Sequence, residues 1–163
     1  MKKFELTAES KINIFGKKLF RIKALISFGD VEEGETGGWI EKEENLEQSS
    51  GDAWVYGDAE VSGNARVSGN AGVSGDAEVS GNARVSGDAD YTTIHGFGTQ
   101  FRTTTFFQCE DKQIRVSCGC FLGTIPEFRE QVKNTREGKI AEEYLMIADL
   151  MEKHFVKEKE SGE

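Results

Sequence analysis

Apolar residues in the middle of the chain recur with a period of six, from Gly51 to Asp90. The hexads read GDAWVY, GDAEVS, GNARVS, GNAGVS, GDAEVS, GNARVS and GDAD, and valine and alanine are the apolar residues that the complete hexads share. A period of six does not keep one residue type on one face of a helix with 3.6 residues per turn, and each glycine in a helix interior is unfavourable by about 1 kcal/mol relative to alanine. The pattern therefore predicts short strands separated by tight turns.

Each hexad supplies one short strand and one corner. Valine is β-branched and favours a half-buried strand, alanine fits a narrow interior, and glycine followed by Asp or Asn is typical of a turn. Three hexads then close a coil of 18 residues, and successive coils stack about 4.8 Å apart through parallel strand pairing. The expected stacks are Glu60 with Glu78, Arg66 with Arg84, Gly72 with Asp90, Asp58 with Asp76, and Asn64 with Asn82.

The V-S-G-N-A-R spacing resembles the apolar-x-x-x-small-x pattern of the hexapeptide-repeat family. Members of that family form left-handed parallel β-helices. The resemblance implies a mainly β protein in which residues 37–90 form a short left-handed parallel β-helix with triangular coils. It does not by itself indicate a function, because one scaffold can carry many different sites.

The residues before the hexads predict an N-terminal β cap, which we place at 1–36. The segment FRIKALISF, residues 20–28, alternates apolar and polar positions as a half-buried strand does. Residues 11–15 form a second expected strand, joined to the first by a turn at 16–18. Ile40 and Leu46 already stand six residues apart, which indicates an irregular first coil. A cap is physically required because a bare stack would expose strand edges and apolar interior.

Residues 91–163 predict an α+β region. FRTTTFF and QIRVSCGCF are rich in strand-forming residues and are separated by a short polar turn, so they indicate a hairpin. Thr124 and Glu127 have the spacing of a capping box, which predicts a helix that ends at Gly138. A second helix is expected over about 139–156. Together these elements predict a hairpin covered by two helices.

The second expected helix carries more apolar positions than one small sheet needs. We expect the surplus either to pack within the chain or to form a self-association surface, with a homodimer as the favoured oligomer. The candidate oligomerisation residues are Tyr144, Leu145, Leu150, Met151 and Phe155.

The flanks of the hexads add a second resemblance. GETGGWIEKEENL before them, and TTTFF, IRVSCGCF, GT, EF and AEEYL after them, are similar to uncharacterised hexapeptide-repeat proteins of phages and prophages of Gram-positive bacteria, some of them labelled polymer-forming. The resemblance implies a phage-type accessory protein and carries no family-wide activity.

The charge of the chain is concentrated in the hexads. The formal net charge of the 163 residues is -9, and residues 51–90 hold seven acidic and two basic side chains. Such a surface repels nucleic acid and attracts a basic protein partner. The N-terminal sequence has no apolar core of a signal peptide and nowhere do 18 apolar residues run together, so we expect a cytoplasmic protein with no membrane partner.

Catalytic and metal-binding patterns are sparse. Hexapeptide-repeat acyltransferases use a histidine as general base, and His95 is the one histidine near the hexads, while His154 lies on the second expected helix. The three cysteines, Cys109, Cys118 and Cys120, read as reduced buried thiols. The aspartates of the stacked corners read as solvated turn residues, with a hard-cation site as the alternative. We therefore expect no catalytic residue, metal or cofactor.

The sequence favours a non-catalytic interaction protein that presents acidic groups to a basic protein partner. One version is an inhibitor of a bacterial defence complex, such as a CRISPR effector, that competes with nucleic acid. An assembly protein whose coils stack end to end, and a divergent acyltransferase, are the alternatives. Trp54 and Tyr56 are candidate aromatic anchors, or else pack against the first coil. The candidate partner-binding residues are Trp54, Tyr56, Asp58, Glu60, Asp76, Glu78, Asp88 and Asp90.

Overall fold

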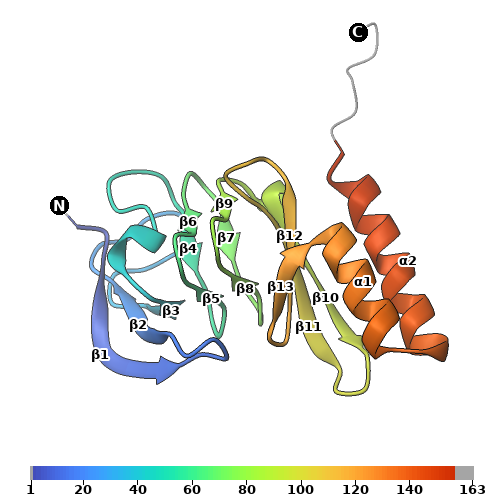
Figure 1. The fold of residues 1–163 in the computed structure, drawn as a ribbon. Helices are drawn as coiled ribbons and strands as arrows, with labels where there is room; N and C mark the ends of the chain where they lie inside the picture. The colour runs from blue at the N-terminus through green and yellow to red at the C-terminus, as the bar shows by residue number, and fades with distance from the viewer. Residues whose placement is uncertain (1, 157–163) are drawn as a thin grey trace, which may run out of the picture.

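The computed structural model describes residues 2–156 as a hairpin, the hexad region (51–90), an antiparallel sheet and two helices, which follow one another along an elongated molecule (Figure 1). The protein is mainly β, with both helices at the C-terminal end. The hairpin and the helices lie at opposite ends, and the hexad region lies between them (Figure 1).

The N-terminal hairpin consists of β1 (Phe4–Ile12) and β2 (Lys18–Ala24), paired antiparallel. The side chain of Asn13 closes its turn by accepting hydrogen bonds from two backbone N–H groups, each at 2.9 Å. The predicted hairpin is confirmed, but the predicted strand bounds are wrong. β1 starts earlier than residue 11, and β2 ends at Ala24 instead of continuing to residue 28, because the chain there turns into a loop closed by a bridge between Phe28 and Val31.

Two-residue strands form the hexad region, and they pair in parallel at a separation of 18 residues. The pairs are Trp54 with Gly72, Glu60 with Glu78, and Arg66 with Arg84. The predicted glutamate and arginine stacks are thus confirmed. The strands are β4 (Trp54–Val55), β5 (Glu60–Val61), β6 (Arg66–Val67), β7 (Gly72–Val73), β8 (Glu78–Val79) and β9 (Arg84–Val85).

The expected stack of Gly72 with Asp90 is wrong. Residues Asp88–Asp90 form a short 3-10 helix instead of a strand. The carboxylate of Asp88 accepts a hydrogen bond from the Gly72 backbone N–H at 3.0 Å, in the place where a further strand would have paired. The last hexad therefore continues the repeat in sequence but forms no strand, and β9 is the last strand of the hexad region.

The core of the hexad region is built from its repeated alanines and valines. All of these side chains are buried, from Ala53 to Val85. The strand β3 (Thr36–Ile40) continues this packing toward the N-terminus, because it pairs antiparallel with β2 and parallel with β5. The hairpin and the hexads thus share one five-stranded sheet.

A four-stranded antiparallel sheet follows the hexads, where the sequence predicted a hairpin. One of its faces packs on the hexad region through Phe107, and the other packs on the helices through Phe106. Its strands are β10 (Tyr91–Phe97), β11 (Arg102–Gln108), β12 (Ile114–Cys118) and β13 (Phe121–Thr124).

Both predicted helices are present, as α1 (Ile125–Thr135) and α2 (Gly138–His154). The predicted capping box at the start of α1 is confirmed, since Thr124 Oγ1 accepts from the Glu127 N–H and Glu127 Oε1 accepts from the Thr124 N–H. Across residues 2–156, neither helix combines the length and the apolar character needed to cross a membrane.

Candidate functional site

At the face formed by β4 and β7, the aromatic ring of Tyr56 packs on Gly72. Tyr56 directly follows β4, and a Cβ atom at Gly72 would lie 3.1 Å from Cε2 of the tyrosine ring. Every other hexad carries a larger residue, Trp, Glu, Arg or Asp, at the position of Gly72, so the glycine leaves room for the ring. The Tyr91 hydroxyl donates to the Gly72 carbonyl at 2.7 Å and accepts from the Ser74 N–H at 3.2 Å, which fixes the backbone beneath the ring.

Four carboxylates lie near enough to the Tyr56 phenol for their charges to act on its pKa. Burial raises the pKa of the Tyr56 phenol, and the negative charges of the four carboxylates raise that pKa further. The phenol therefore stays protonated and neutral at physiological pH. We define the Tyr56 face as Tyr56 with Gly72 and the four acidic residues Asp30, Glu35, Asp52 and Asp88.

The acidic groups of the Tyr56 face have no cationic partner among residues 2–156. None of the four carboxylates lies within 4.0 Å of a basic side-chain nitrogen there. Lys3 lies near Asp52, but its ammonium group points inward, where it donates to the Ala53 carbonyl at 2.9 Å and sits 4.8 Å from the centre of the Phe28 ring. The negative charge of this face is therefore available to a ligand.

The neighbouring face, formed by β5 and β8, carries its acids in a different state. Glu60 forms an ion pair with Lys11 at 2.8 Å. Burial, followed by the charge of Glu60, raises the pKa of Glu78 to about 7. Asp58 lies 3.9 Å from the Arg21 guanidinium, and Asp76 is exposed. Much of the charge on this face is thus balanced within the chain.

The structure separates the predicted partner-binding residues from one another. It contradicts Trp54 as a surface anchor, because the indole is fully buried against the rings of Phe4 and Phe28. Tyr56 and Asp88 belong to the Tyr56 face. Asp90 is half-buried and accepts hydrogen bonds from the backbone and side chain of Ser86, which is a local structural role.

Sequence reasoning missed Gly72 and three of the four acidic members of the Tyr56 face: Asp30, Glu35 and Asp52. Asp52 occupies the same hexad position as Asp58, Asp76 and Asp88, so the repeat register contained a signal for it. Asp30 and Glu35 lie in the loop between β2 and β3. Nothing in their local sequence indicates that this loop folds back beside Tyr56.

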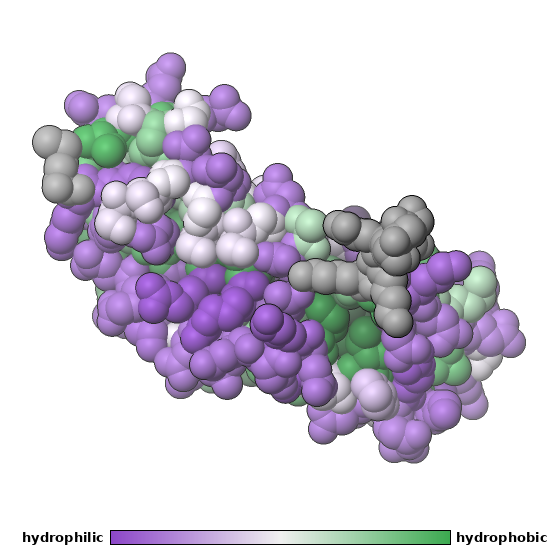
Figure 2. Space-filling view, turned by 90° about the horizontal axis from the view of Figure 1, so that it is seen from above, coloured by the Kyte–Doolittle hydropathy of each residue, from purple (hydrophilic) through white to green (hydrophobic). Residues whose placement is uncertain are grey.

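The predicted oligomerisation residues differ in how far the structure exposes them. Tyr144 and Met151 are buried in the core between the sheet and the helices, which contradicts a role at the surface. Leu145 and Phe155 are half-buried against the same core. Leu150 is 56% exposed, and Met146, which the sequence analysis did not single out, is 70% exposed. Figure 2 shows hydrophilic residues over most of the visible face, with hydrophobic ones both toward the end that carries the helices and at the end of the N-terminal hairpin.

The remaining reactive side chains, His95 and the three cysteines, do not lie together in one site. His95 is exposed on β10 with Nδ1 3.1 Å from Thr103 Oγ1. Cys109 is buried, and burial raises the pKa of its thiol to about 11. Cys118 is half-buried, and Cys120 is exposed, which contradicts the expectation of a buried thiol there. In residues 2–156 no group of three His, Cys, Asp or Glu side chains has the arrangement of a metal site.

No protein-family model matches this chain, and a search of the curated proteins finds no match either.

Proposed function

We propose that this chain is a non-catalytic interaction protein that binds a basic segment of a protein partner through the Tyr56 face. The observation that carries the proposal is that four carboxylates near a half-buried tyrosine form no ion pair within residues 2–156. An Arg or Lys side chain placed over a tyrosine ring gains roughly 0.5–2 kcal/mol from the cation-π interaction, and nearby carboxylates add charge complementarity. Acidic residues at this density therefore select for a cationic ligand.

Rigidity strengthens this interpretation. We propose that the hexad region is a left-handed parallel β-helix, as the 18-residue pairing register and the family resemblance support. Tyr56 is held by its backbone, because its N–H donates to the Val73 carbonyl at 2.7 Å. A surface that is already ordered loses little conformational entropy when it binds.

The partner class that fits such a face is a protein that itself binds nucleic acid. Its Lys and Arg side chains are spaced to meet phosphates, and regularly placed carboxylates compete for the same groups. Together with the resemblance to phage proteins, this favours an inhibitor of a bacterial defence effector. We expect the protein to weaken nucleic-acid binding by that effector and to raise phage survival in hosts that carry it.

The alternative function, an assembly protein whose hexad regions stack end to end, fits the structure less well than partner binding. β11 covers the C-terminal side of the stack, where Thr105 Oγ1 accepts from the Glu78 N–H and the Glu110 N–H donates to the Asn82 carbonyl. On the other side, β3 pairs with β5. Strand edges that are already paired do not template further strands.

A binding titration tests the Tyr56 face directly. We expect a labelled arginine octapeptide to bind the protein, with affinity that falls as NaCl rises from about 50 to about 300 mM. The double variant Asp52→Asn with Asp88→Asn should bind about tenfold more weakly, since each change removes one charge. Asparagine at 88 keeps an acceptor for the Gly72 N–H, so the fold should persist.

The matched control is Asp58→Asn with Asp76→Asn, which removes the same charge from the neighbouring corner. We expect this pair to weaken binding less than about threefold. If both double variants lose affinity equally, the peptide responds to net charge alone and the Tyr56 face is not the site.

A further inference from the structure

The solvent-exposed side of α2 carries two large apolar side chains, Met146 and Leu150. The opposite side of the helix, which includes Ile147 and Met151, is buried in the core that the helices share with the sheet. Met146 and Leu150 are therefore not needed for the core of the chain. They lie at the end of the molecule that the two helices form (Figure 1).

Charged residues continue this exposed side in both directions. Glu143 lies three positions before Met146, and Lys153 lies three positions after Leu150. All four residues thus follow one another at steps of three and four, the spacing that keeps side chains on one face of an α-helix. We call these four residues the α2 seam. The seam spans about 15 Å, at 1.5 Å per residue, and it is acidic at its N-terminal end and basic at its C-terminal end.

The two charged members of the α2 seam are free to pair with another molecule. Neither Glu143 nor Lys153 forms an ion pair within residues 2–156. The contact between the helices uses other residues of α2, since Arg129 of α1 pairs with Asp149 at 2.8 Å and with Glu152 at 3.1 Å. The seam is therefore separate from the packing of α1 on α2.

A second copy of the chain fits the α2 seam in one orientation. In an antiparallel pair with two-fold symmetry, Met146 packs on Leu150 of the partner subunit and Glu143 meets Lys153 of the partner subunit, because both pairs are centred on Ala148. A parallel pair would place each charged residue against its own copy, and like charges repel. Charge complementarity therefore favours the antiparallel arrangement.

We propose that the chain forms an antiparallel homodimer through the α2 seam, with Met146 and Leu150 at the centre and two Glu143–Lys153 ion pairs between the subunits. Four residues from each subunit are far fewer than the roughly 20–30 of a standard interface, so the association is weak and depends on concentration. The dimer carries two Tyr56 faces, and it forms whether or not those faces bind a partner.

A charge-reversal cycle, measured by sedimentation equilibrium of the full chain, tests the ion pairs. Glu143→Lys and Lys153→Glu each turn two attractive contacts of the dimer into two repulsive ones. Each variant should therefore raise the dissociation constant of the dimer about tenfold. The double variant restores both contacts with exchanged signs and keeps the net charge of the chain, so its dissociation constant should return to within about twofold of the original value.

The two single variants also control for net charge. Glu143→Lys makes the net charge of the chain less negative, and Lys153→Glu makes it more negative. If overall repulsion alone governed association, one variant would therefore dimerise more tightly and the other less tightly. Such opposite effects would overturn the proposal, and so would a double variant that dimerises no better than either single variant.

Discussion

At the scale of single residues, the repeated glycines serve two structural roles: they adopt a positive φ, and some of them leave room for a neighbouring stretch of backbone. All but the last begin their hexads with a positive φ, the left-handed region that glycine adopts without strain. Some of them also lie against the backbone of a later hexad. A Cβ at Gly69 would lie 2.5 Å from the Ser86 carbonyl oxygen, whereas a Cβ at Gly75 would meet nothing within 4 Å. The sequence shows the same glycine at both positions, and only the stacking tells them apart.

Alanine at these two positions should therefore have unequal effects. Gly75→Ala carries only the left-handed penalty and should lower the free energy of unfolding by about 1–2 kcal/mol. Gly69→Ala at a nearly equal φ adds the clash with Ser86 and should lower it by about 3 kcal/mol or more. Urea denaturation of the two variants measures the difference. Equal losses would mean that Gly69 does not approach the Ser86 backbone as closely as the structure has it.

At the scale of elements, the period of the sequence predicted strand pairing well. The 18-residue register of the glutamates and arginines follows from the hexads alone, and the capping box of α1 follows from two residues. β10 and β13 were missed, since β10 holds a glycine with positive φ and β13 is only four residues long. The burial of Trp54 was missed for another reason: the loop and hairpin that cover it are distant in sequence.

The β5–β8 ladder gives the protein a titration near neutral pH. The folded-state pKa of Glu78, about 7, lies above the ordinary value of 4.5, so the folded state favours the protonated acid. The contribution of Glu78 to the free energy of unfolding is therefore fully present below pH 4.5, and it is lost as the pH rises through 7. Glu78→Gln should therefore raise the free energy of unfolding at pH 8 by about 1–2 kcal/mol, after allowance for solvent screening, and leave it unchanged at pH 4.5.

Chemical denaturation at the two pH values measures this effect. The control is Asp76→Asn, an exposed carboxylate two residues earlier, which should change the free energy of unfolding by less than about 0.5 kcal/mol at either pH. A gain for Glu78→Gln that is the same at pH 4.5 and pH 8 would contradict a raised pKa for this carboxyl group.

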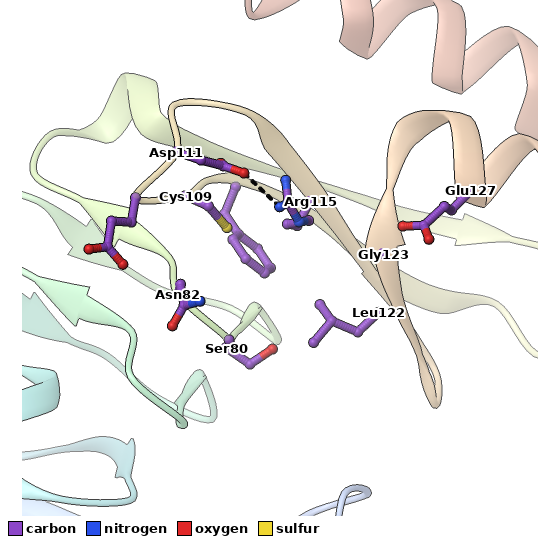
Figure 3. A pocket seen from close by; sticks show the side chains of 11 residues that line it. Ser80, Asn82, Cys109, Asp111, Arg115, Leu122, Gly123 and Glu127 are labelled. Atoms are coloured by element: carbon purple, nitrogen blue, oxygen red, sulfur yellow. Dashed lines mark hydrogen bonds and ion pairs between the residues drawn. The ribbon is translucent and has the colours of Figure 1, made fainter.

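At the scale of the whole molecule, the candidate sites lie where separate segments meet. The Tyr56 face joins a hexad corner to the loop between β2 and β3, and a cavity between Asn82 and Leu122 lies where another corner meets the C-terminal sheet (Figure 3). The sequence predicted the segments but not the contacts between them, because local patterns specify which side of an element is buried and not which distant element covers it. Asp30 and Leu122 are the clearest examples.

The exposed side of α2 bears on the oligomeric state. Met146 and Leu150 are one helical turn apart, and an isologous dimer would bury both against their copies. We expect light scattering on a sizing column to give a mass that approaches twice 18.0 kDa as concentration rises, and Leu150→Glu to return it to the single-chain value. Ile14→Glu makes the same change at a similar exposure, 53%, in the turn of the hairpin, and should leave the mass unaltered. A single-chain mass for the unaltered protein at every concentration would contradict the dimer, and equal effects of both variants would place the contact elsewhere.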